Sequence, residues 1–181
     1  MKKLLVSALI GLASTAALAD HHNAVSLEGV KYKATASLMG ESAKETFDGF
    51  AIGYENSANP VGWGVKAELL DADYVDLSSV AVYAHKDLWA NDKAYVKGSI
   101  GAGLSYLELD GVDVSQGSFI LPINLEAGVN VAKNVAVYGT VGYRWDWGFE
   151  DTTVDFGDES VKIDAIDLDG VNYKLGVKYK F

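Results

Sequence analysis

The chain ends on Gly170-Val171-Asn172-Tyr173-Lys174-Leu175-Gly176-Val177-Lys178-Tyr179-Lys180-Phe181. Apolar side chains occupy every second position of this stretch, from Val171 to Phe181, and polar residues or glycine stand between them. Because successive side chains of a β-strand point to opposite faces, strict alternation predicts a strand with one apolar and one polar face. The polar face would carry Asn172, Lys174, Gly176, Lys178 and Lys180.

The same alternation recurs along the rest of the chain, and Gly, Asn, Asp and Ser clusters interrupt it. Seven further segments show it: 30–38, 47–55, 61–69, 78–86, 95–106, 119–129 and 135–147. Both faces of 78–86 are apolar, so the orientation of that strand stays open. Short links alternate with longer acidic ones, which is typical of a meander with turns at one end and loops at the other. The pattern predicts an all-β fold, an eight-stranded antiparallel up-and-down barrel over 27–181.

The first nineteen residues have the features of an export signal. Lys2 and Lys3 precede an apolar segment over 4–17, and Ala17-Leu18-Ala19 has the small residues of a cleavage site. We therefore expect a cleaved signal peptide at 1–19 and a periplasmic tail at 20–26, followed by the barrel. No later segment approaches the roughly 20 consecutive apolar residues of a transmembrane helix.

Composition excludes several classes of function. The chain has 25 acidic and 15 basic residues, and loss of Lys2 and Lys3 with the signal would move its net charge from −10 to −12. A nucleic-acid partner would require clustered Lys and Arg, so none is expected. There is no cysteine, and hence no disulfide or thiolate metal site. No cofactor-binding motif is evident either.

Alternation alone does not tell a soluble barrel, with its apolar face inside, from a membrane barrel, with its apolar face outside. Small residues on the predicted apolar faces, such as Ala34, Ala36, Ala67 and Ala102, would fill a core poorly. Aromatic residues fall toward the strand ends, as in the girdles of membrane barrels. The aromatic residues of the two girdles would be Tyr32, Tyr54 and Trp63 on the turn side, and Phe50, Tyr106, Phe119, Trp145, Trp147 and Tyr173 on the loop side. Together with the export signal, these features favour an apolar face that contacts lipid.

The last eight residues carry a family resemblance. A polar residue, Lys174, is followed two positions later by Gly176, then by apolar residues two apart, including Tyr179, and finally by Phe181. This pattern resembles the assembly signal of bacterial outer-membrane barrels. The chain as a whole resembles the small eight-stranded Gram-negative barrels of the OmpA transmembrane domain, OmpX and Ail type. The resemblance implies an outer-membrane location, a monomer, and contact with the barrel assembly machinery, membrane lipid and lipopolysaccharide.

The predicted polar faces would place charged side chains in the barrel interior. These are Lys31, Lys33, Lys66, Lys97, Arg144, Lys174 and Lys178, with Glu55, Glu68, Glu126 and Asp146. Two interpretations stay open. The charges could form an ion-pair network that fills a narrow barrel, or their excess of seven positive over four negative could line a narrow anion-favouring channel.

Two segments could hold metal ions. Cleavage after Ala19 would leave Asp20-His21-His22 at a free amine, and the amine, backbone amides and His22 imidazole suit Cu(II) or Ni(II). A disordered tail is the alternative interpretation. The acidic stretch 149–169 could bind calcium or magnesium, but Ala165 and Gly176 occupy the positions of the first and last ligands of a calcium loop. A solvated surface loop is the simpler interpretation.

Catalytic residues are not evident. After cleavage the histidines are His21, His22 and His85, and none stands in a His-x-Ser arrangement of the kind expected in a lipid-modifying barrel enzyme. The sequence predicts a non-enzymatic outer-membrane protein with a role in envelope integrity or in surface interaction such as adhesion or resistance. A narrow solute channel and a lipid A-modifying enzyme are the alternatives.

Overall fold

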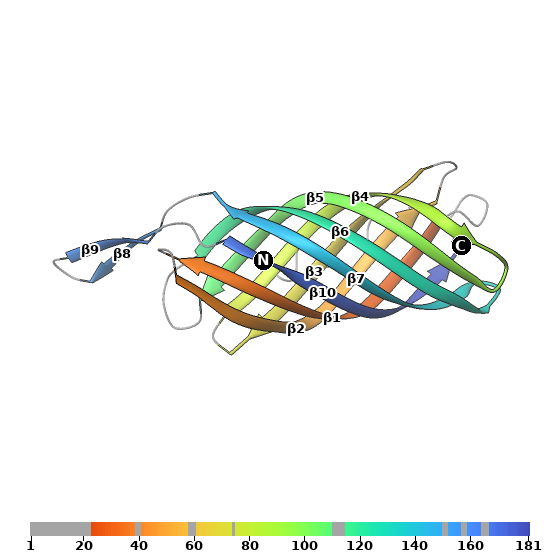
Figure 1. The fold of residues 1–181 in the computed structure, drawn as a ribbon, viewed down its shortest axis with the longest axis horizontal. Coiled ribbons are helices and arrows are strands. Elements are labelled where there is room, and N and C mark those ends of the chain that lie inside the picture. The colour runs from red at the N-terminus through yellow and green to blue at the C-terminus, as the bar shows by residue number, and fades with distance from the viewer. Residues whose placement is uncertain are drawn as a thin grey trace.

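The computed structural model describes residues 23–38, 41–57, 61–73, 75–109, 115–149, 152–156, 159–163 and 167–181. Within them, eight long strands close into one antiparallel barrel, in the order β1-β2-β3-β4-β5-β6-β7-β10, and β8 and β9 form a separate two-stranded sheet (Figure 1). The predicted all-β, eight-stranded meander is therefore confirmed. No helix in the described residues is long and apolar enough to cross a membrane.

The barrel strands are 11 to 18 residues long. Their bounds are β1 Asn23–Leu38, β2 Glu41–Asn56, β3 Gly62–Ala72, β4 Val75–Ala90, β5 Ala94–Leu109, β6 Ser115–Ala132, β7 Val135–Gly148 and β10 Asp167–Lys180. The hairpin pairs β8 Thr152–Phe156 with β9 Glu159–Ile163. Figure 1 shows this hairpin beyond the barrel end opposite the C-terminus. We call that end the loop end, and the end with the links 57–61, 91–93 and 133–134 the turn end.

The strands extend further than the sequence predicted at both ends of the barrel. β1 begins at Asn23, which pairs with Asn56, and Ala24 pairs with Lys180. Residues 23–26 therefore belong to the barrel and not to the predicted tail. At the loop end, segments 41–46 and 70–77 lie almost wholly in strands instead of loops. Residues 1–22 lie outside the described part of the chain, so the signal peptide and its cleavage stay predictions.

The predicted orientation of six strands is confirmed by burial. In β2, β3, β5, β6, β7 and β10 the apolar set faces outward and the polar set faces inward. The open question in β4 is also resolved, because Ala81, Tyr83 and His85 are buried inside the barrel whereas Val82 and Ala84 are exposed outside.

The predicted orientation of β1 is wrong. Val30, Tyr32 and Ala34 point inward and are buried, whereas Lys31 and Lys33 are exposed on the outside. Tyr32 is therefore not part of an outer aromatic girdle. The orientation is reversed because the inward residues of this half of β1 pack in an apolar cluster that fills the barrel at its loop end.

This cluster, which we call the cap, closes the loop end of the lumen. Its buried members are Val30, Tyr32, Ala34, Phe47, Ala51, Leu70, Leu77, Leu107 and Leu168. The Tyr32 hydroxyl donates a hydrogen bond to the Leu168 carbonyl across the β1–β10 pair. On the outside, a row of charged side chains crosses five strands in register, and each of them is next in sequence to a buried residue of the cap: Lys31, Asp48, Asp71, Asp76 and Glu108.

Below the cap, toward the turn end, the pattern is the opposite. We call this part the band. Its outer surface carries large exposed apolar side chains, among them Leu27, Phe50, Trp63, Val82, Ile100, Leu125, Val141, Tyr173, Leu175 and Val177. Its interior carries charged side chains. The barrel therefore changes polarity along its length: apolar outside and charged inside in the band, charged outside and apolar inside at the cap.

Candidate functional site

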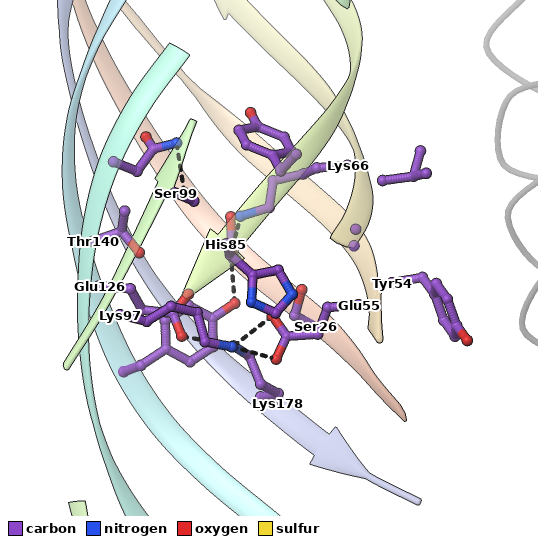
Figure 2. Close-up of a pocket in the computed structure, with 17 residues that line it drawn as sticks. Ser26, Tyr54, Glu55, Lys66, His85, Lys97, Ser99, Glu126, Thr140 and Lys178 are labelled. Carbon is purple, nitrogen blue, oxygen red and sulfur yellow. Dashed lines mark hydrogen bonds and ion pairs between the residues drawn. The ribbon is translucent and has the colours of Figure 1, made fainter. Parts of the chain in front are cut away.

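The interior of the band holds three levels of ion pairs, and the level nearest the turn end is built around Lys178 of β10. Its ammonium group donates to Glu55 Oε2 at 3.0 Å and to Glu126 Oε1 at 2.6 Å. Lys97 contacts the other Glu55 oxygen at 2.8 Å (Figure 2). The Tyr95 hydroxyl donates a hydrogen bond to Glu126 at 2.8 Å. Strands β2, β5, β6 and β10 each contribute to this level because their polar faces point inward.

The middle level joins Lys66 of β3 to Glu28 of β1. The ammonium of Lys66 lies 2.6 Å from Glu28 Oε1, and the Tyr138 hydroxyl donates to the same oxygen at 2.5 Å. Glu28 was not among the predicted interior residues, because the first strand was expected to show its alternation only from Val30. The signal is present in the sequence: Val25 and Leu27 alternate with Ser26 and Glu28.

The level below the cap contains two further pairs. Lys174 of β10 binds Glu68 of β3, and Arg144 binds Asp146, both on β7. Ser105 donates to the Asp146 carboxylate at 3.1 Å and lies 2.5 Å from the Ser118 hydroxyl. The Arg144 guanidinium also stacks on the Tyr32 ring, 5.0 Å from its centroid, so this level contacts the cap directly.

Charge is balanced within the ion pairs of the interior. Five cations are paired there with five carboxylates: Lys66, Lys97, Arg144, Lys174 and Lys178 with Glu28, Glu55, Glu68, Glu126 and Asp146. The expected excess of seven positive over four negative charges is wrong, because Lys31 and Lys33 lie outside and Glu28 lies inside. Removal of a single partner would leave a buried charge uncompensated, which makes this network a structural unit.

Two polar cavities lie in the lower interior, one among the ion pairs and one at the turn end. One of about 40 Å³ is bordered by unpaired buried atoms of Glu28, His85, Asn124 and Thr140, which provide polar partners for water. The second, about 150 Å³, lies at the turn-end mouth and shares the lining residues Glu55, Lys97 and Lys178 with the first. Water can therefore reach the lower interior from the turn end, whereas the cap fills the loop end.

The residues of the two predicted metal sites lie wholly or mostly outside the part of the chain whose side chains the structure describes. Asp20, His21 and His22 lie outside the described residues. The described part of the chain holds no group of three His, Cys, Asp or Glu side chains placed to bind a metal ion. Two carboxylates of the acidic stretch 149–169 form hydrogen bonds with the barrel. The Asp169 carboxylate accepts one from the backbone amide of Asp146 at 2.9 Å, and the Asp167 carboxylate accepts one from the backbone amide of Gly148 at 3.2 Å.

The residues of the predicted assembly signal take distinct positions on the last strand. Lys174 and Gly176 face the lumen, whereas Tyr179 is exposed outside, with its ring stacked on that of Phe181 at 6.3 Å. A side chain at Gly176 would meet Glu28 and the Tyr138 ring within 2.9 Å. The glycine of the motif therefore leaves room for the middle ion-pair level.

Known structures share this architecture. The crystal structure of the Neisserial surface protein A superposes with a TM-score of 0.64 and 18% identity, over 88% of this chain and 97% of that chain. The chain has the fold of the small outer-membrane barrels. Similar matches are the outer membrane protein OprG from Pseudomonas aeruginosa, with a TM-score of 0.60 and 13% identity over 88% and 96% of the chains, and Ail of Yersinia pestis.

The attachment invasion locus protein Ail, in complex with the heparin analogue sucrose octasulfate, matches with a TM-score of 0.53 and 16% identity, over 88% of this chain and 98% of that chain. No protein-family model matches the chain, and no curated protein sequence matches it. At these identities the likeness concerns the fold, so the role of the chain has to be argued from its own surfaces and interior.

Proposed function

We propose that the chain is a non-enzymatic integral protein of the Gram-negative outer membrane that seals its own lumen and presents its loop end at the cell surface. Its role there would be envelope integrity or a surface interaction such as adhesion or resistance. The observation that carries the proposal is the change of polarity between the band and the cap. An apolar exterior over a charged interior suits lipid, and a charged exterior over an apolar interior suits water.

The interior supports a plug more than a channel. Six ion pairs join five cations to five carboxylates in the lumen, and the apolar cap fills its loop end. Ions could pass only if the ion pairs of the lumen broke and their charges found other partners. The cap residues Tyr32, Phe47 and Leu77 would also have to move apart. The anion-favouring channel also loses its electrostatic basis, because the interior has no excess of positive charge among the described pairs.

The loop end supports a surface role with a cationic partner. Outward carboxylates of four adjacent strands stand in one row there, and the sequence 149–169 adds eight acidic residues against Lys162. A surface of this charge attracts positive groups and repels polyanions such as the sulfated sugar bound to Ail. The surface that this chain recognises would therefore carry positive charge.

Catalysis is not part of the proposal. His85 lies in the band interior near the turn end, where its neighbours in the cavity include Glu55, Lys66 and Lys97. A lipid-modifying enzyme would place its histidine with a nucleophile toward the outer leaflet.

Two measurements test the proposal. Membrane fractionation together with gel mobility before and after heating should place the folded chain in the outer membrane as a heat-modifiable barrel; recovery as a detergent-independent periplasmic protein would refute the membrane assignment. Planar-bilayer recordings on the refolded chain should show no stable conductance. Regular channels whose conductance changes on Arg144→Gln or Glu126→Gln would instead establish the narrow channel.

A further inference from the structure

A groove of about 400 Å³ crosses the outer face of the band near the turn end. Its floor is formed by small residues, since Ala127 of β6 stands opposite Gly139 of β7. Larger side chains border that floor, with Val96 next to Ala127 on one side and Leu175 next to Gly139 on the other. Trp89, 53% exposed, lies at the margin of the groove.

Gly139 makes the surface hollow without serving the interior. A Cβ atom built at this position would meet only the Lys174 carbonyl oxygen, at 3.7 Å, which is ordinary contact. The inward glycines differ: at Gly176 the nearest atoms lie at 2.8 Å. The space above Gly139 is therefore open to whatever surrounds the barrel, and a larger side chain could fill it without moving the backbone.

Two basic turns lie at the end of this groove. Lys93 immediately precedes Ala94, which lines the groove. Lys133 lies in the turn that joins β6 to β7, and residues of these two strands also line the groove. Both lysines are exposed. Asn130 holds the turns together, because its backbone amide donates to the Lys93 carbonyl at 2.8 Å and its side chain to the Asp92 carbonyl at 2.9 Å.

The charge of this rim is opposite to that of the loop end. Among the described residues, the exposed charged side chains near the turns are Lys86, Lys93 and Lys133 with Asp87 and Asp92. Their sum is positive, although the chain as a whole has a net charge of −10. Anionic groups are therefore attracted to the rim next to the groove and repelled from the opposite end.

We infer that the groove binds one acyl chain of an anionic phospholipid, whose phosphate group lies between Lys93 and Lys133. The inference rests on the proposed membrane location, with the turn end toward the periplasm. An acyl chain above Ala127 and Gly139 gains contacts with the floor and with both walls, which a flat barrel surface would not provide. The two ammonium groups add attraction for the phosphate, and Trp89 suits the headgroup region.

Native mass spectrometry of the full-length refolded chain tests the inference. The detergent-solubilised protein is mixed with phosphatidylglycerol or with phosphatidylcholine of identical acyl chains, and the lipid retained per barrel is counted. We expect one phosphatidylglycerol molecule to be retained in preference to phosphatidylcholine. Gly139→Leu should reduce retention of both lipids by roughly tenfold, because it removes the volume for several methylene groups.

A second groove provides the matched control. It also lies on the outer face, between β10 and β2, and has a volume of about 420 Å³. Its lining includes Gly29, Lys31, Asp48, Tyr173 and Leu175. A Cβ atom at Gly29 would meet only a carbonyl oxygen at 3.9 Å, and its lysine is already paired with Asp48 at 3.1 Å. Gly29→Leu should therefore leave lipid retention unchanged.

The attraction between the two lysines and the lipid phosphate is tested separately. The double variant Lys93→Gln/Lys133→Gln should lose the preference for phosphatidylglycerol, roughly fivefold per lysine, and keep its retention of phosphatidylcholine. Lys86→Gln, elsewhere on the same rim, should keep the preference. Equal effects of Gly139→Leu and Gly29→Leu, or an unchanged preference in the double variant, would overturn the inference. A wild-type chain that does not insert into bilayers would refute the proposed membrane location instead.

Discussion

The cap and the band are built from the same eight strands but have opposite polarity. In the band, Lys178 and Glu126 are buried beside the partly buried Glu55, while Leu175 outside is 70% exposed. At the cap, Tyr32 and Phe47 are buried while Lys31 outside is paired with Asp48. The backbone pairing continues without interruption from one region to the other along β1. The same backbone pairing therefore accommodates an apolar face on either side of the barrel wall.

The largest expected effect concerns the interior of the band. Lys178→Met would leave the carboxylates of Glu55 and Glu126 without the ammonium group that lies between them. Breaking a buried ion pair from one side costs about 3–5 kcal/mol, so the free energy of unfolding should fall by about that amount. Urea unfolding in lipid vesicles, followed by tryptophan fluorescence, measures it. Lys133→Met, in an exposed turn, should leave the midpoint unchanged.

The next effect distinguishes the outer faces of the two regions. Val141 is exposed on the outside of the band, and Ser115 on the outside near the loop end. Val141→Arg should cost about 2–4 kcal/mol if that surface contacts the lipid core, whereas Ser115→Arg should change stability by less than about 0.5 kcal/mol. Equal effects in the same unfolding assay would show that the membrane boundary does not lie between the two positions.

A smaller effect concerns the interior of the cap. Tyr32→Phe would retain the packing of the ring but would remove the hydroxyl that donates to the Leu168 carbonyl. We expect a loss of about 1 kcal/mol. Tyr173→Phe, on the outer face, is the matched control and should be neutral. Increased ion leakage through vesicles containing Tyr32→Phe, without a loss of stability, would show that the hydroxyl acts as a gate and does not support packing.

The smallest effect concerns the acidic row outside the cap. Asp71 stands in register with Asp48 on one side and Asp76 on the other, and like charges directly opposite each other destabilise a sheet. Asp71→Asn should raise the free energy of unfolding by about 0.5 kcal/mol. The gain should shrink at high salt because exposed charges are screened. Asp92→Asn in the turn 91–93 should give no gain; an equal gain there would show only a general effect of net charge.

Much of the fold could be predicted from alternation, but the position of its boundaries could not. Segment 41–46 has no large apolar residue and segment 70–77 carries three aspartates, so both were expected in the links between strands. They are strands because Phe47, Leu70 and Leu77 face inward there while polar side chains face water. A strand whose polar side is outside shows the same alternation as one whose polar side is inside.

The interior site was predictable in its composition and not in its pairing. Lys66, Glu68, Lys97, Glu126, Arg144, Asp146, Lys174 and Lys178 all stand on the inward faces that the alternation indicated. Glu28 was missed and Lys31 was misplaced, and these two residues changed the expected charge balance. Which lysine meets which carboxylate depends on side chains that approach each other across the lumen.

The sequence by itself determined the number of barrel strands, their antiparallel order and the orientation of six of them, because the two-residue period of a strand is a local property of the backbone. Tertiary structure alone decided where the polarity reverses along β1 and how the interior charges pair. Those features depend on neighbours that are distant in sequence, such as Tyr138 and Glu28, 110 positions apart and in contact at 2.5 Å. Alternation shows that two faces differ; only closure of the barrel places one of them inside.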